Sequence, residues 1–362
     1  MPRRLAPWIV VLLMMAAPAA AQEARPSVLS VDSSASVDVT VDADGNQVGF
    51  TGIFLDTLVV GGLGRHVEAI VRPQVQRLGN SGEWNRQLWV AELRYERPGP
   101  VAFRVEGGYI PSPVGLANLT LRPHMNPTIG QPSELFTSTP SPELRGPRIN
   151  LLSGIYPLGG QATVSARHWD TRVAVMDTSP LRLRRVFATP NVPLFAGNPP
   201  RFTNVVVGGG VTPFVGFRVG ASLTHGGWLR AGESPTVTAN RDANLVTVEA
   251  ELSFRHTALA GEWVHDAIET SFGTRSTAGW YLQGAQALSP RWFVAGRFDD
   301  IRTTLPVAAA LEQNFRNTEQ TLGFRVTPEI TLRVSHRMRE PFGATTWAHV
   351  GAFSIVWYRR WM

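Results

Sequence analysis

The chain has 362 residues, of which 43% are hydrophobic and only 17% are charged. It contains no cysteine, which excludes disulfide bonds, thiolate metal sites and cysteine nucleophiles. All 34 basic residues are arginine, and the 34 glycines and 27 prolines exceed what a mostly helical protein tolerates. This length argues against a single small domain and allows one large barrel.

The first 21 residues have the features of an export signal. Arg3 and Arg4 precede a short apolar stretch from Leu5 to Ala17, and small residues at Ala19–Ala21 suit a cleavage site. Cleavage would remove both arginines and lower the formal net charge from +6 to +4. We therefore predict a signal peptide at residues 1–21 and a single exported domain at residues 22–362.

Apolar and polar residues alternate along most of the mature chain. Every second residue from Val246 to Phe254 is apolar and those between are polar or charged, and Ile330 to Arg339 is similar. Because successive side chains of a strand point to opposite faces, each segment has one apolar and one charged face. No segment with helix start and stop signals competes, so the pattern predicts an all-β protein.

The length of these segments separates a membrane barrel from a soluble sandwich. They span about 10 to 14 residues, closer to the roughly 9–11 of a tilted membrane strand than to the roughly 5–6 of soluble sheets. Tight turns rich in proline and glycine alternate with longer loops; they include Arg97–Gly99, Pro157–Gly160, Thr212–Pro213 and Ser289–Arg291. Short turns on one side and long loops on the other are typical of outer-membrane barrels.

The pattern predicts a transmembrane antiparallel β-barrel of about 16 strands with short periplasmic turns; 18 or 14 strands are the alternatives. The expected strands are 31–41, 48–60, 66–77, 85–97, 100–110, 147–156, 160–177, 202–213, 216–228, 242–255, 258–270, 275–288, 291–303, 317–327, 330–340 and 347–361. Aromatic residues near many strand ends, including Trp84, Trp89, Trp228 and Trp292, suggest two interfacial girdles.

The third loop, Pro111 to Pro147, is the longest. A loop of this length without regular structure is normally functional or disordered. Folded into the lumen it would narrow the passage; the alternative is a surface loop that caps the mouth. Its candidate constriction residues are Arg122, His124, Glu134, Glu143 and Arg145.

The end of the chain resembles a known family. The final strand, Trp347 to Met362, carries Phe353, Ile355, Trp357 and Trp361 on one face, similar to the aromatic last strand that the barrel-assembly machinery recognises. The segment GWYLQGAQALSPRWFVAGRFD, Gly279 to Asp299, resembles a late hairpin of phosphate-selective porins (the O/P-like type). The resemblance implies a trimeric bacterial outer-membrane channel for small anions. Phosphate-selective members use lumen lysines, and this chain has none.

Alternation also predicts which charged residues line the pore. The basic candidates are Arg72, Arg94, Arg104, Arg218, Arg297, Arg325, Arg333, Arg337 and Arg339. The acidic candidates are Glu68, Glu92, Glu106, Glu249, Glu251, Asp299 and Glu319. A wall of arginine favours anions, whereas arginine–carboxylate pairs would cancel much of the field. We expect a mild anion preference.

Other classes of function were weighed against the channel. A loop-plugged structural or substrate-binding barrel is the main alternative, and a hydrolase at the rim, using His225 with Asp242 or His265 with Asp266, is the enzymatic one. The histidines are scattered without metal-ligand spacing. We expect no enzyme activity, no metal, no cofactor and no nucleic acid. The expected partners are small solutes, outer-membrane lipid and lipopolysaccharide.

Overall fold

The computed structural model describes residues 29–42, 48–78, 82, 84–139, 143, 146–147, 149–152, 157–182, 186–188, 200–305 and 311–361. The predicted signal peptide at residues 1–21 lies outside these described residues. None of the described helices is long and apolar enough to cross a membrane.

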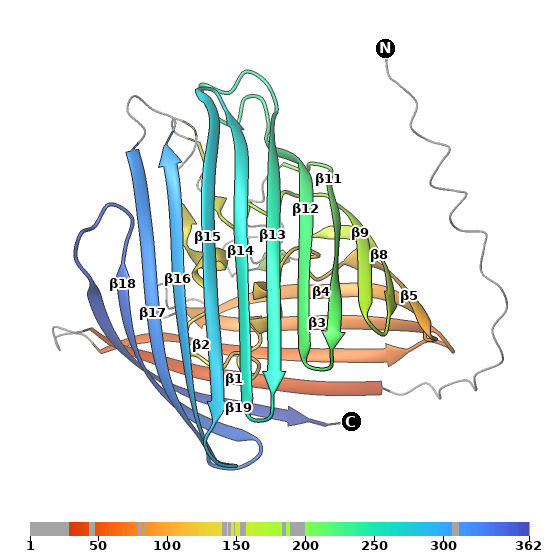
Figure 1. The fold of residues 1–362 in the computed structure, drawn as a ribbon, viewed down its shortest axis with the longest axis vertical. Coiled ribbons are helices and arrows are strands. Elements are labelled where there is room, and N and C mark those ends of the chain that lie inside the picture. The colour runs from red at the N-terminus through yellow and green to blue at the C-terminus, as the bar shows by residue number, and fades with distance from the viewer. Residues whose placement is uncertain are drawn as a thin grey trace.

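Sixteen antiparallel strands form a closed barrel (Figure 1). They are β1 (Leu29–Asp42), β2 (Val48–Gly62), β3 (Val67–Leu78), β4 (Trp84–Arg97), β5 (Val101–Tyr109), β8 (Leu158–Ala166), β9 (Trp169–Met176), β11 (Asn204–Phe214), β12 (Phe217–Leu229), β13 (Arg241–Phe254), β14 (Thr257–Thr270), β15 (Gly273–Ala287), β16 (Trp292–Leu305), β17 (Leu311–Arg325), β18 (Ile330–Glu340) and β19 (Ala348–Arg360). Each pairs with its neighbour along the chain, and β1 pairs with β19, for example Val37 with Ile355. This pairing of the first and last strands closes the sheet into a barrel, and the predicted count of 16 is confirmed.

A short additional strand, β10 (Val186–Ala188), completes the side of β4. It pairs with Arg86–Leu88 at one end of β4. The neighbouring strand β5 reaches only as far as Ala91 of β4. β10 therefore occupies the edge that β5 leaves open.

Two of the predicted strands are wrong, and their errors cancel in the count. The described part of 147–156, residues 147 and 149–152, contributes no barrel strand. Within it Ile149–Asn150 (β7) is extended and pairs with Ser138–Thr139 (β6) in a separate small sheet. The single strand expected at 160–177 is a hairpin of β8 and β9.

Two predicted turns are displaced as well. Pro157–Gly160 leads into β8, and Thr212–Pro213 lies within β11. The β11–β12 turn comes later and contains Gly216, whose φ is 93°. A Cβ atom there would lie 2.3 Å from the carbonyl oxygen of Ser253, so glycine alone fits this turn.

The strands are apolar outside and polar inside. On β13, for example, Thr247 and Glu249 point inward and are buried, while Val248 between them points outward and is exposed. Trp84 and Trp292 are exposed, and because they begin strands that run in opposite directions they lie at opposite rims of the barrel, as two girdles require. Trp89 and Trp228 are buried inside the barrel, so their assignment to a girdle is wrong.

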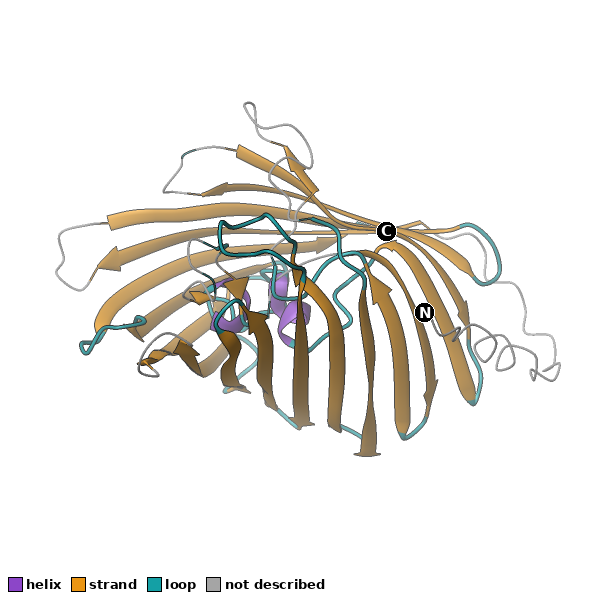
Figure 2. Ribbon diagram, turned by 90° about the horizontal axis from the view of Figure 1, so that it is seen from above, coloured by secondary structure: helices purple, strands orange, loops and turns teal. Residues whose placement is uncertain are grey.

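The third loop, between β5 and β8, folds into the barrel, which rules out a surface cap. Its helical segments η2 (Ala117–Leu121) and α1 (Ser133–Phe136) lie inside the ring of strands (Figure 2). Its apolar side chains, including Val114, Leu135 and Leu151, form one hydrophobic cluster with inward-pointing residues of the wall such as Trp228. Burial of these side chains holds the loop in the lumen.

Candidate functional site

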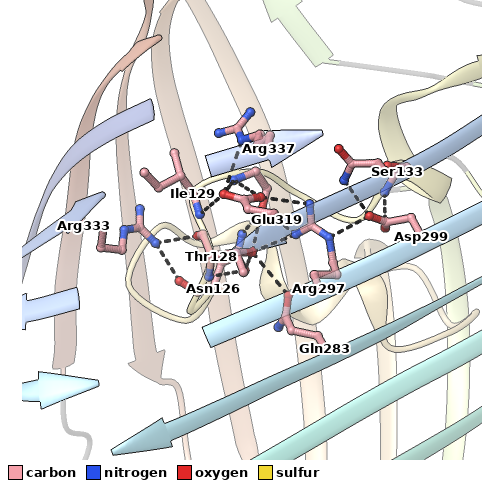
Figure 3. Close-up of polar contacts among 12 residues, drawn as sticks. Asn126, Thr128, Ile129, Ser133, Gln283, Arg297, Asp299, Glu319, Arg333 and Arg337 are labelled. Atoms are coloured by element: carbon pink, nitrogen blue, oxygen red, sulfur yellow. Dashed lines mark hydrogen bonds and ion pairs between the residues drawn. The ribbon is translucent and has the colours of Figure 1, made fainter. Parts of the chain in front are cut away.

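Carboxylates of the barrel wall hold the third loop by its backbone. Glu319 on β17 accepts hydrogen bonds from the backbone N–H groups of Ile129 and Gly130, at 2.9 and 3.1 Å (Figure 3). Asp299 on β16 accepts one from the N–H of Ser133 at 3.0 Å. Hydrogen bonds from backbone N–H groups to buried carboxylates are among the stronger ones in proteins. These three contacts therefore need no particular loop side chain.

A third carboxylate anchors the start of the loop. Glu262 on β14 accepts hydrogen bonds from the N–H groups of Leu116 and Ala117, each at 2.9 Å. Gly115 precedes them with a φ of 72°, and a Cβ atom there would lie 1.9 Å from Glu262 Oε1. Glycine is thus required for the loop to approach this carboxylate.

Two arginines of the same wall hold the loop through its carbonyl oxygens. Arg297 on β16 donates to Gly130 O and Thr128 Oγ1 at 2.7 and 2.8 Å. Arg333 on β18 donates to the carbonyl oxygens of Asn126 and Thr128, both at 2.7 Å. Figure 3 shows these guanidinium groups pointing at the same stretch of loop from both sides. Their charges are committed to the loop.

The opposite wall holds the loop through Arg122. Its guanidinium donates to Asp56 on β2 at 3.0 Å and also to Asp32 on β1. Asp56 is fully buried and forms a second ion pair, with Arg72 on β3, at 2.7 Å. The loop thus spans the lumen from β1–β3 to β14–β18. Removing one member of such a buried pair typically costs about 3–5 kcal/mol.

His124 lies in the same part of the loop, stacked on Tyr358 of β19 with ring centroids 4.1 Å apart. Burial and the nearby Arg122 guanidinium lower the pKa of His124 from 6.5 to about 4. The imidazole is therefore neutral at physiological pH and adds no positive charge to the lumen.

One cavity, the loop-side cavity, has a volume of about 390 Å³ and lies between the loop and strands β1–β4 and β16–β18. Its charged lining residues are Asp38, Arg297, Arg333, Arg337 and Arg339. Its neutral polar lining includes Gln74, Gln76, Gln87 and Asn317, and Trp89 also lines it. Even with Asp299 and Glu319 behind the arginines counted, positive charges exceed negative ones here.

A second cavity, the turn-side cavity, has a volume of about 460 Å³ and lies where the strands approach their tight turns. Its charged lining residues are Arg94, Glu96, Arg104, Glu106, Asp170, Arg172, Arg218, Glu249 and Glu251. They pair across strands: Arg218 contacts Asp170 at 3.0 Å and Glu249 at 2.6 Å, and Arg94 contacts Glu106 at 2.9 Å. Its field is largely cancelled.

The structure places the sixteen candidate wall residues at inward-facing positions of their strands. Most surround the two cavities or hold the loop. Glu68 and Arg325 lie instead near the tight turns, where Arg325 stacks over Phe293 with its guanidinium 5.2 Å from the ring centroid. Glu92 is buried and pairs with Arg94 at 3.0 Å.

The loop candidates have different positions. Arg122 and His124 lie in the lumen as described. Glu143 accepts a hydrogen bond from Thr236 Oγ1 at 3.2 Å, which ties the third loop to the loop between β12 and β13. Glu134 lies in α1, its side chain outside the described part, and Arg145 is outside the described residues altogether.

Sequence reasoning missed the carboxylates Asp32 and Asp56. Their inward positions on β1 and β2 follow the same alternation, but nothing near them in the chain indicated a partner as distant as Arg122. Sequence reasoning also missed one pair of neighbouring histidines. His336 and His349 stack on the outward face of β18 and β19, with Nε2 and Nδ1 3.2 Å apart.

The structure gives no support to catalysis at the rim. The His225 and His265 rings lie on the outward face and contact Asn244 and Ser276, at 2.9 and 2.8 Å. Asp266 is fully buried inside the wall, on the face opposite to His265. Among the described residues, no group of three or more histidine and acidic side chains could hold a metal ion.

No family model and no curated protein sequence matches this chain. Solved structures match its fold. One is OmpF of Salmonella typhi in complex with daunomycin, with a TM-score of 0.61 at 10% identity, covering 92% of this chain and 98% of that one. Another is the anion-selective porin of Comamonas acidovorans, with a TM-score of 0.55 at 11% identity, covering 93% of this chain and 100% of that one. OmpT of Vibrio cholerae in its trimer form has a TM-score of 0.58 at 8% identity, and the match covers 92% of this chain and 100% of that one.

These similarities show that the chain has the sixteen-strand barrel fold of outer-membrane porins. At such low identities they show the fold alone. A phosphate-selective subtype finds no support among them.

Proposed function

We propose that this protein is a porin: a passive diffusion channel for small hydrophilic solutes in the bacterial outer membrane, with a mild preference for anions. The observation that carries the proposal is the third loop, which crosses the lumen between two cavities lined by charged and polar side chains. Polar linings of this kind accommodate water, and a loop inside the barrel limits the size of what passes.

The anion preference rests on the loop-side cavity. Arg337 and Arg339 line it. Arg337 pairs with Glu319 at 3.3 Å, and Glu319 also pairs with Arg297 and accepts the loop amides of Ile129 and Gly130. Arginine stays charged at any working pH. The excess of guanidinium charge over carboxylate charge in this cavity attracts anions, whereas the turn-side cavity contributes little.

The fold also supports the proposals on location and assembly. The apolar outer surface and the exposed aromatic residues at strand ends suit lipid and lipopolysaccharide. Export through a signal at residues 1–21, insertion by the barrel-assembly machinery and a homotrimer complete the proposal; OmpT of Vibrio cholerae has been solved in a trimer form.

A second candidate is a barrel closed by its loop. The observation that favours it is the hydrophobic cluster inside the lumen, in which Val114, Leu135 and Leu151 are completely buried. Such a barrel would bind solutes without passing them.

Recording from the purified protein in a planar bilayer distinguishes the two candidates. The channel proposal predicts stepwise conductance and an anion-selective zero-current potential in a gradient of dilute KCl. Screening acts over about 10 Å at 0.1 M salt, so the selectivity should fade in concentrated KCl. Correct insertion without any conductance would favour the closed barrel.

A further inference from the structure

The loop-side cavity has polar groups that neither the loop nor the wall satisfies. Gln74 on β3 and Asn317 on β17 are 3% and 2% exposed, and both line the cavity. Neither Gln74 Oε1 nor Asn317 Oδ1 has a hydrogen-bond partner among the described residues. Both oxygens lie just behind the cavity surface. Because buried acceptors without partners are costly, a rotation of either amide toward the cavity lets it receive a hydrogen bond from a bound molecule.

Positive charge lies in the same cavity. Arg337 and Arg339 are two residues apart on β18, so both side chains point inward from the same face. Arg337 shares Glu319 with Arg297 and with the loop. Arg339 lies over Phe315, with its guanidinium 5.9 Å from the ring centroid, and has no ion-pair partner within the described part of the chain. This pair is the available anion-binding element of the cavity.

The remaining lining defines the body of the ligand. Gln76 and Gln87 add neutral amides to that of Gln74, and Trp89 adds an aromatic side chain. Amides and an aromatic ring suit a flexible or cyclic molecule with several hydroxyl groups, because hydroxyls donate to the amide oxygens while C–H groups pack on the ring. A volume of about 390 Å³ is large enough for a molecule of about six carbons.

We propose that the loop-side cavity is a binding site for a small hydroxylated carboxylate, such as a sugar acid. The carboxylate binds Arg337 and Arg339, and the hydroxyl groups donate to Gln74 and Asn317. The site rests on the proposed function, since it lies on the path through the channel, and it gives that path a preferred class of solute. Simple inorganic anions satisfy the arginines but leave the two amide oxygens without partners.

Calorimetric titration of gluconate into the detergent-solubilised protein tests the site without requiring a conducting pore. Gluconate should bind to the wild type, and glucose, which lacks the carboxylate, should not bind measurably. Arg339→Gln should weaken gluconate binding by about tenfold or more, as loss of a charged hydrogen bond does. Gln74→Leu should weaken it about fivefold while leaving the arginines in place.

Arg325→Gln is the matched control, because this inward arginine lies near a turn and does not line the cavity. It should bind gluconate like the wild type. Heat-dependent migration in SDS gels verifies that each variant is a folded barrel. Absence of gluconate binding, or equal weakening by Arg325→Gln and Arg339→Gln, would overturn the site. Unchanged binding by Gln74→Leu would overturn the role of the hydroxyl groups.

Bilayer recordings separate this proposal from the channel itself. A wild type that conducts ions but binds no gluconate keeps the channel and loses the site. A wild type that binds gluconate but never conducts keeps the site and loses the diffusion function.

Discussion

The two cavities of this barrel have the same number of lining arginines, four each, but one acidic residue lines the loop-side cavity and five line the turn-side cavity. The difference arises from the third loop. Asp299 and Glu319 pair with Arg297 at 3.1 and 3.3 Å and also accept loop amides, and neither lines the loop-side cavity. Asp170 and Glu249, which pair with Arg218, do line the turn-side cavity. A loop folded into a barrel can thus cover wall carboxylates and leave arginines as most of the charged lining of a cavity.

The largest effect is expected from disrupting the loop anchor. Glu319→Gln removes the charge that Arg297 and Arg337 share and weakens the bonds from Ile129 and Gly130. Loss of one partner in a buried network should destabilise the docked loop by about 3–5 kcal/mol. Limited trypsin digestion measures this, because undocking exposes cleavage sites in the loop.

Glu329→Gln is the matched control for the anchor. Glu329 is 46% exposed at a turn and lies 3.8 Å from Arg359, so its loss should cost less than about 1 kcal/mol. Equal digestion rates for Glu319→Gln and the wild type would show that the loop does not depend on this carboxylate.

Removing the loop-side charge should have the next largest effect. The double variant Arg337→Gln, Arg339→Gln removes two positive charges from the loop-side cavity, where positive charges exceed negative ones. The zero-current potential in dilute KCl should move toward cation preference. The outward-facing Arg302, which is 56% exposed, provides the control: Arg302→Gln should leave the potential unchanged. A potential that does not move in the double variant would place these arginines off the conducting path.

A charge-neutral change in the turn-side cavity should have a smaller effect. Arg218→Gln with Asp170→Asn removes one partner of each sign from a balanced cluster. The shift in zero-current potential should be well below that of the loop-side double variant. A shift of similar size would mean that the two cavities contribute equally to selectivity.

The smallest effect is expected from pH. The pKa of docked His124 is about 4, below the 6.5 of the free group, so an undocked loop takes up the proton first. The contribution of the neutral imidazole to loop docking is therefore fully present above pH 6.5 and is lost as pH falls toward 4. The equilibrium constant for docking falls by at most about tenfold per pH unit. Arg122, Arg72, Asp32 and Tyr358 face this imidazole.

Trypsin is not suited to that pH range, so bilayer noise between pH 6.5 and 4.5 provides the measurement. In His124→Asn the part of the pH dependence that comes from the imidazole should disappear. An identical pH profile in wild type and variant would contradict a docked histidine with a lowered pKa.

Strand alternation predicted the barrel and the inward face because each barrel strand obeys one local rule. Errors arose where a local signal was absent or misleading. The turn at Arg167–His168 contains neither glycine nor proline, so β8 and β9 were predicted as one strand. Leu151 and Leu152 resembled part of a strand because they are apolar, but they are buried in the lumen with the loop.

The partners of the loop could not be predicted from the sequence. Loop residues such as Arg122 follow no periodic pattern, and the residue that it contacts, Asp56, lies 66 positions earlier. The charged wall residues could be assigned to the lumen, but their roles could not. Arg333, expected to attract solutes, donates to loop carbonyl oxygens instead.

The most direct test of the account is the single-channel conductance of a variant in which residues 116–142 are replaced by a short glycine linker. The wall and both sets of arginines remain, while the anchors at Glu262, Asp299 and Glu319 lose the loop. Heat-dependent migration in SDS gels confirms that the barrel has assembled. The account predicts a severalfold higher conductance and a weaker anion preference, because two cavities merge into one wide lumen and the carboxylates are released. Unchanged conductance from a correctly inserted variant would contradict it.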